Sequence, residues 1–227
     1  MATAKTEPRL RYSPPIVRSC RDEGHFFIPG VSYRGETGDY LLFEKMTPEM
    51  PQDKLIELYE REKQAGNPLP TDLPLIWAIA TRGYELRDEN NEEAKRLQKF
   101  FRNSFRSCPN TLTRVHYSPE VDCILHNVGT SEQYISEGNV VGPDGWLDKI
   151  PDKGILERVL GTQDVKQINN VVQHINGTNV YLCRINSKPE QLDKRVARFD
   201  ADDVRLVLNC FRGPRIEYPA FRVLKIE

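Results

Sequence analysis

The chain has 227 residues and a formal net charge of −1 at pH 7, and 29% of its residues are charged. This length suggests one domain or two small ones, and such a chain can bury roughly 70% of its unfolded surface. The charge balance excludes a disordered chain, and a pI near 6.5 argues against a protein that coats nucleic acid over its whole surface. The longest apolar run, residues 73–80, is far shorter than the ~20 residues that a bilayer requires.

Five cysteines are present, and no two of them are spaced as a CxxC pair. Residues 1–20 contain no continuous apolar segment of the kind that a secretory signal needs, so we expect reduced thiols and a cytoplasmic location. Cys20 and His25 have four residues between them and could supply two metal ligands. Nothing in the spacing supplies the third and fourth ligands that zinc needs. We therefore predict no metal ion and no cofactor.

The order of the predicted elements indicates an α+β fold. Helices are expected mainly in the first half and after residue 150, packed on a mostly antiparallel sheet built from the second half. Residues 1–20 are polar and expected to be loosely ordered. Residues 21–227 are expected to form a single domain, with a possible lobe boundary near residue 109.

The first elements after the N-terminal segment are two short strands and a helix. The strands are predicted at residues 25–28 and 40–43, and turns are predicted at Pro29-Gly30 and at residues 35–39. A helix is predicted from residue 51 to Gly66. It is expected to end there because Gly66 comes directly before Asn67-Pro68.

The centre of the chain predicts two consecutive helices. Thr71 is the expected N-cap of the first, and Asp72 adds negative charge where the helix dipole is positive. Apolar side chains then recur at helical spacing, at Leu73, Ile76, Trp77, Ala80 and Tyr84. Because this helix is apolar over most of its circumference, we expect it to be buried. The second helix begins near Asn91 and ends before Pro109.

The second half changes from a helical period to the period of two that strands show. A hairpin is predicted from residues 111–117 and 121–127, with a two-residue loop at Pro119-Glu120. The later elements are a short strand near 134–135, helices at 152–160 and after Thr162 or Asp164, and strands at 180–185, 204–209 and 221–226.

The helix that begins near Asn91 carries a basic face made of Lys95, Lys99, Arg102 and Arg106. Between residues 91 and 118, six basic residues are opposed by two acids, a local balance of +4. Such a face concentrates positive potential and could bind an acidic protein or nucleic-acid phosphates. The alternative is an ordinary solvated helix face.

The predicted hairpin places His116 directly opposite Cys123, because paired positions sum to 239 for this loop. A thiol beside an imidazole is the minimal nucleophile and base pair. The alternative is that both side chains simply pack in the sheet, and a slip of one residue would separate them onto opposite faces.

Two functions follow from these features. The first is a non-catalytic binding module that uses the basic helix face, with an acidic protein or a nucleic acid as its partner and no membrane association. The second is an enzyme with Cys123 as nucleophile and His116 as base. The sequence leaves open whether the protein is an enzyme.

Overall fold

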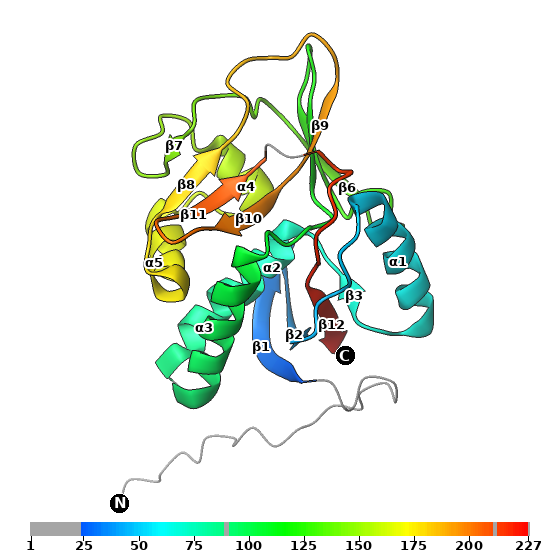
Figure 1. Ribbon diagram of the computed structural model, residues 1–227, viewed down its shortest axis with the longest axis vertical. Helices are drawn as coiled ribbons and strands as arrows, with labels where there is room; N and C mark the ends of the chain where they lie inside the picture. The colour runs from blue at the N-terminus through cyan, green and yellow to red at the C-terminus, as the bar shows by residue number, and fades with distance from the viewer. Residues whose placement is uncertain (1–23, 89–90, 211–212, 227) are drawn as a thin grey trace, which may run out of the picture.

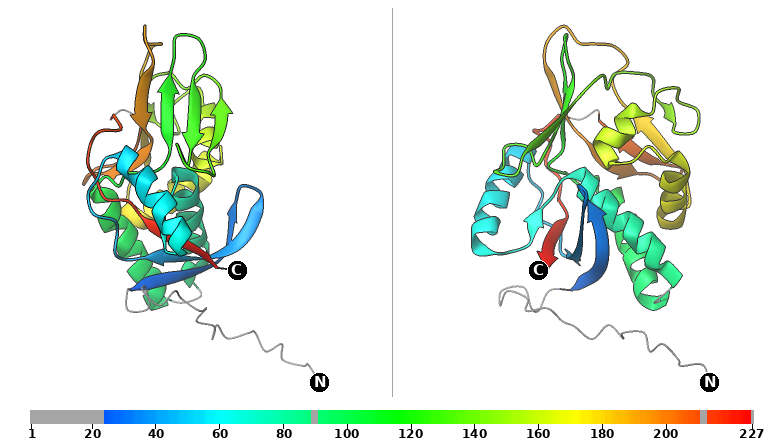
Figure 2. Two further views of the ribbon diagram at one scale, coloured as in Figure 1. Left: turned by 90° about the vertical axis from the view of Figure 1, so that its right-hand side faces the viewer. Right: turned by 180° about the vertical axis from the view of Figure 1, so that it is seen from behind.

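The computed structural model describes residues 24–88, 91–210 and 213–226 and has the predicted α+β fold. The strands of these residues form three four-stranded sheets that lie in different parts of the molecule, as Figures 1 and 2 show. The predicted loose segment at residues 1–20, together with Cys20, lies outside the described residues.

The first sheet contains strands from both ends of the chain, in the order β1-β2-β12-β3. Its members are β1 (His25–Tyr33), β2 (Glu36–Phe43), β12 (Arg222–Ile226) and β3 (Leu69–Pro70). β12 pairs antiparallel with both β2 and β3, so the last strand of the chain completes the sheet that the first two begin.

The hairpin of β1 and β2 is longer than predicted. The predicted turn at Pro29-Gly30 is wrong, because both residues lie inside β1 at a bulge. Gly30 has a φ of 65°, and its N–H donates to the Asp39 carboxylate at 2.9 Å. The true turn is Arg34 and Gly35, with φ values of 53° and 78°. Positive φ at both central residues is what a two-residue type I′ turn requires.

The second sheet has the order β10-β11-β8-β7. Its members are β10 (Arg198–Ala201), β11 (Leu206–Asn209), β8 (Val180–Cys183) and β7 (Gly145–Trp146). β8 and β11 run parallel, whereas the other pairs of this sheet are antiparallel.

The third sheet contains the predicted hairpin and has the order β6-β5-β4-β9. Its members are β6 (Tyr134–Glu137), β5 (Cys123–His126), β4 (Arg114–Tyr117) and β9 (Asp193–Val196). The register of β4 and β5 is the predicted one, with His116 opposite Cys123.

The helices begin and end close to the predicted residues. They are α1 (Gln52–Ala65), α2 (Leu73–Glu85), α3 (Asn91–Arg106), α4 (Gly154–Leu160) and α5 (Val165–Asn176), and a 3₁₀ turn, η2 (Leu86–Asp88), follows α2. Gly66, Gly161 and Gly177 end α1, α4 and α5 in the left-handed conformation that glycine adopts without strain. Among the described residues, no helix has both the length and the apolar character needed to cross a bilayer.

The central helix α2 is buried, as its sequence predicts. It contacts β1, α3, α4 and α5, and Figure 1 shows it in the middle of the molecule. Ile76, Trp77 and Ala80 are each at most 2% exposed. The predicted N-cap is wrong by one residue, because the carboxylate of Asp72, not the Thr71 hydroxyl, accepts from the Leu75 N–H at 2.9 Å. Asp72 is fully buried and is itself the cap. Its predicted role was only that of an additional negative charge beside a Thr71 cap.

Replacing Asp72 tests how much its buried carboxylate stabilises the fold. Asp72 also accepts from the part-buried hydroxyls of Tyr33 and Tyr134. Asp72→Ala should lower the free energy of unfolding by about 3 kcal/mol, since a lost N-cap costs about 1 and each hydroxyl left without its acceptor costs about 1. Urea unfolding followed by circular dichroism measures the change. Asp72→Asn is the control, because its amide oxygen can still cap the helix, and it should cost clearly less. Equal stability of Asp72→Ala and the parent chain would contradict this account.

Candidate functional site

The Asp72 carboxylate joins three segments of the chain. Besides the cap bond, it accepts from the Tyr33 hydroxyl of β1 at 2.5 Å and from the Tyr134 hydroxyl of β6 at 3.1 Å. Burial, followed by the neighbouring carboxylate, raises the pKa of both tyrosines. Both hydroxyls therefore remain protonated donors, and the hairpin tip is held against the start of α2 and the third sheet.

Arg34 extends from the hairpin turn onto the Tyr134 ring. Its guanidinium carbon lies 3.8 Å from the ring centroid, and the other side of Tyr134 stacks on His126 at 4.6 Å. Within the described residues, Arg34 has this cation–π contact but no hydrogen bond or salt bridge of its own. A guanidinium whose one contact is a cation–π contact keeps all five of its N–H donors available.

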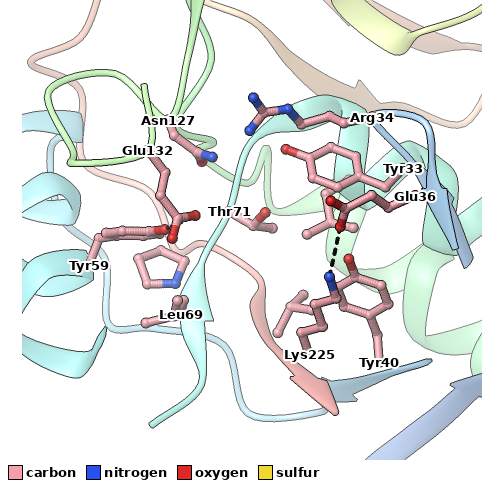
Figure 3. A pocket seen from close by; sticks show the side chains of 13 residues that line it. Tyr33, Arg34, Glu36, Tyr40, Tyr59, Leu69, Thr71, Asn127, Glu132 and Lys225 are labelled. Atoms are coloured by element: carbon pink, nitrogen blue, oxygen red, sulfur yellow. Dashed lines mark hydrogen bonds and ion pairs between the residues drawn. The ribbon is translucent and has the colours of Figure 1, made fainter. Parts of the chain in front are cut away.

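A cavity of about 420 Å³ lies beside Arg34, and we call it the hairpin pocket. Figure 3 shows Tyr33, Glu36 and Tyr40 of the hairpin on one side of it and Tyr59 and Glu132 on the other. The N-terminal end of α2 contributes Leu75, and the remaining lining residues are Leu69, Pro70, Thr71, Asn127, Val223 and Lys225. Polar side chains thus make up most of the lining, and Leu69, Pro70, Leu75 and Val223 supply its apolar part.

Asn127 has an unusual position in this pocket. It directly follows β5, has a φ of 48° and is only 6% exposed. Its Oδ1 is buried and has no hydrogen-bond partner. A buried amide acceptor without a donor costs free energy, so such groups are rare in folded proteins. Figure 3 shows the Asn127 side chain at the edge of the pocket above Glu132.

The Glu132 carboxylate of the pocket is held in the ionised form. Glu132 accepts from Tyr59 and from Lys63, each at 2.7 Å, and the hydrogen bond from Lys63 is the main reason why its pKa is lowered. Glu36 pairs with Lys225 at 3.0 Å. The lining thus carries two cations, Arg34 and Lys225, and two carboxylates, so that its formal charge is zero but its charges are separated.

A second cavity of about 350 Å³ lies on the other side of Tyr33 and Arg34. His126 lines it and is fixed by two hydrogen bonds. Its Nε2 lies 2.8 Å from the carbonyl oxygen of Arg158, and its Nδ1 lies 3.0 Å from Oγ1 of Thr113. These partners indicate a neutral ring with the proton on Nε2, because the carbonyl oxygen can only accept.

The structure places the predicted nucleophile and base opposite each other, but their surroundings favour uncharged side chains. Burial, then the carboxylates of Glu137 and Asp122, raises the pKa of the Cys123 thiol. Burial, then the cations of Lys194 and Arg114, lowers the pKa of His116. A thiolate nucleophile needs shifts in the opposite directions. The catalytic role of this pair therefore stays a prediction without support from its electrostatic surroundings.

The predicted basic face of α3 is exposed, but three of its four residues contact other groups. Lys95 pairs with Glu92 at 3.2 Å on the same helix, and Arg106 pairs with Asp203 at 2.8 Å. Arg102 donates to the Ile175 carbonyl at 2.8 Å and so satisfies a C-terminal group of α5. Lys99 is exposed and has no partner among the described residues. Two of the cations thus attach α3 to the rest of the fold, and partner binding by this face stays a prediction.

The residues of the hairpin pocket were not identified from the sequence. Arg34, Asn127 and Glu132 belong to separate segments and share no motif spacing. The one local signal was Arg34-Gly35, a short turn between two strands. Among the described residues, no group of three or more His, Cys, Asp or Glu side chains could hold a metal ion.

Comparison of the chain with protein-family models, with curated proteins and with solved structures finds no match.

The reactivity of Cys123 gives a direct test of its electrostatic surroundings. Iodoacetamide should alkylate it slowly at neutral pH, and the rate should rise only above the usual thiol pKa of about 8.5, since the carboxylates disfavour the thiolate. Peptide mass mapping distinguishes Cys123 from the other cysteines. His116→Gln is the matched variant, and it should leave the rate unchanged. Rapid alkylation at neutral pH that is lost in His116→Gln would restore the nucleophile hypothesis.

The histidines predict a loss of stability in mild acid. Burial lowers the pKa of His126, His116 and His174 in the folded chain. The unfolded chain therefore binds more protons between its histidine pKa of about 6.5 and the lower folded pKa values, and the free energy of unfolding should fall as the pH drops across this window. Urea unfolding at about pH 7.5 and about pH 5.5 measures this difference before most carboxylates titrate. A stability that is constant or higher at the lower pH would contradict the prediction.

Proposed function

We propose that the protein is a non-catalytic binding protein and that the hairpin pocket is its recognition site. The observation that carries the proposal is Arg34, which lines the pocket and whose guanidinium is stacked on Tyr134 without a hydrogen bond or ion pair within the described residues. An anionic ligand group would supply the acceptor for its N–H donors.

The size of the pocket suits a small molecule. A volume of about 420 Å³ lies within the range of small-molecule sites, and the largely polar lining favours a polar ligand. The Asp72 carboxylate holds the side chains of Tyr33 and Tyr134 in place beside the pocket. A preformed site of this kind loses little entropy when it binds.

The two functions considered from the sequence have less support. The α3 face uses Arg102 and Arg106 in contacts with α5 and Asp203. The Cys123 and His116 pair has its pKa values shifted toward the neutral forms. The binding function is therefore assigned to the pocket, where polar groups remain without partners.

The variant Arg34→Asn separates binding from folding. Arg34 has a φ of 53° and precedes Gly35, and Asn-Gly is the preferred pair for a type I′ turn, so the free energy of unfolding should be unchanged or higher. Binding should be lost, because the guanidinium is absent. The probes are L-phenylalanine, adenosine 5′-monophosphate, maltose and succinate at millimolar concentration, and changes in ¹H–¹⁵N spectra report contact with the pocket.

The matched control is Lys99→Ala on α3, far from the pocket in sequence and without a partner of its own. It should bind as the parent chain does. The proposal fails if no probe shifts the resonances of Arg34, Asn127 or Glu132. It also fails if Arg34→Asn binds a probe as tightly as the parent chain, because the guanidinium would then take no part in binding.

A further inference from the structure

We infer that the second cavity binds the phosphate group of a small phosphate monoester, between the guanidinium groups of Arg34 and Arg158. This inference goes beyond the proposed function, because the second cavity shares only Tyr33 and Arg34 with the hairpin pocket.

Two arginines from different parts of the fold line the second cavity. Arg34 comes from the turn between β1 and β2, and Arg158 comes from α4. Arg34 makes no hydrogen bond or ion pair within the described residues. Arg158 donates from Nη1 to the Asn139 carbonyl oxygen at 2.9 Å, and its Nε and Nη2 make no hydrogen bond in the part of the chain that the structure describes. Most N–H donors of both groups are therefore available to a ligand.

Both guanidinium groups are held in place by their neighbours. The carbonyl oxygen of Arg158 lies 2.8 Å from Nε2 of His126, and its guanidinium lies against Gly138, which has a φ of 142°. A Cβ at Gly138 would displace this guanidinium. The guanidinium of Arg34 lies on the Tyr134 ring, 3.8 Å from its centroid. Groups that are positioned before binding lose little conformational entropy when a ligand arrives.

The charges of the second cavity favour an anion. Its lining contains the two arginines and one carboxylate, Glu157, so its formal charge is +1, whereas the lining of the hairpin pocket is neutral. Gln163 donates a hydrogen bond to Glu157. Burial lowers the pKa of His126, so its ring adds no charge at neutral pH. Figure 3 shows the Arg34 guanidinium at the upper edge of the hairpin pocket, away from Lys225. An anion on Arg34 thus meets fewer carboxylates on the side of the second cavity.

A phosphate monoester matches two guanidinium groups better than a carboxylate does. It carries about two negative charges at neutral pH and has three terminal oxygens. Each guanidinium is a planar fork that can donate two parallel hydrogen bonds to the oxygens of one phosphate. A carboxylate has one charge and two oxygens, so one fork satisfies it. The hydroxyls of Ser32 and Ser136 belong to the same lining and can donate to further lone pairs of the phosphate.

The volume of the cavity limits the size of the ligand. It is about 350 Å³, near the lower end of the range of small-molecule sites. Its apolar lining residues are Pro74, Ala78 and Leu160, and Tyr33 and Tyr134 add aromatic rings. The ligand is therefore a phosphate with a compact body, and ribose 5-phosphate is a suitable probe.

The test titrates the full chain at about pH 7.5, where a phosphate monoester is a dianion. Methyl phosphate is the simplest monoester, and dimethyl phosphate is the matching diester with a single charge. The amide resonances of Gly35, Ser136 and Gly161 report on binding, since these residues line the second cavity and not the hairpin pocket. Methyl phosphate should bind at least about tenfold more tightly than dimethyl phosphate, because it can occupy both forks. Ribose 5-phosphate should bind at least as tightly as methyl phosphate.

Three variants locate the phosphate. Arg158→Gln should weaken the binding of methyl phosphate at least about tenfold, since it removes one fork. Lys225→Met is the matched control, because it removes the same charge from the hairpin pocket alone, and it should bind methyl phosphate as the parent chain does. Glu157→Gln should bind methyl phosphate about threefold more tightly, since it removes the carboxylate of the lining. Such a gain in affinity cannot result from impaired folding.

The inference is wrong if methyl phosphate and ribose 5-phosphate leave the resonances of the second cavity unchanged. In that case the proposed function still stands if another probe shifts the resonances of the hairpin pocket. The inference is also wrong if dimethyl phosphate binds as tightly as methyl phosphate, if Arg158→Gln and Lys225→Met weaken binding equally, or if Glu157→Gln binds no more tightly than the parent chain. If the second cavity binds methyl phosphate while no probe shifts Asn127 or Glu132, the phosphate site stands and the hairpin pocket is not the recognition site.

Discussion

The buried carboxylate of Asp72 is the constraint on which the candidate site depends. It caps the central helix and accepts from Tyr33 and Tyr134, which come from different sheets. Both tyrosine hydroxyls donate to this carboxylate, so each side chain points inward. The Tyr33 backbone then places the turn that carries Arg34, and the Tyr134 ring supports the guanidinium. The geometry of the pocket is therefore set by the same group that starts the buried helix.

Many cations of the described chain have acceptors, whereas Arg34 at the pocket has none. Arg114 contacts Gln52 and Asp53, and two cations of α3 reach Ile175 and Asp203. Buried polar atoms without a hydrogen-bond partner are not confined to the pocket, since they occur at Arg184 as well as at Asn127. What marks the pocket is therefore the exposed guanidinium of Arg34, which is held on a ring beside a cavity.

Local features of the sequence were sufficient for the helices and for one hairpin. Gly66 and Asp164 act through their own backbone neighbours, and the register of β4 and β5 follows from the length of their loop. Thr71 and Asp72 were both competent caps, and the tyrosine partners of Asp72 lie far away in the sequence. The parallel pairing of β8 with β11 and the pocket itself likewise depend on contacts between distant segments. A single sequence contains no pattern that reports such contacts, so these features had to come from the structure.

The position of β12 has a consequence for how the chain acquires its structure. β12 lies between β2 and β3, and Lys225 pairs with Tyr40 across almost the whole length of the sequence. Contacts between such distant residues close large loops and slow the search for the native state. During synthesis, β1 and β2 leave the ribosome long before their partner strand and expose an unpaired edge until it arrives. Chaperone protection of that edge would matter most in this interval, because unpaired strands readily associate with other chains.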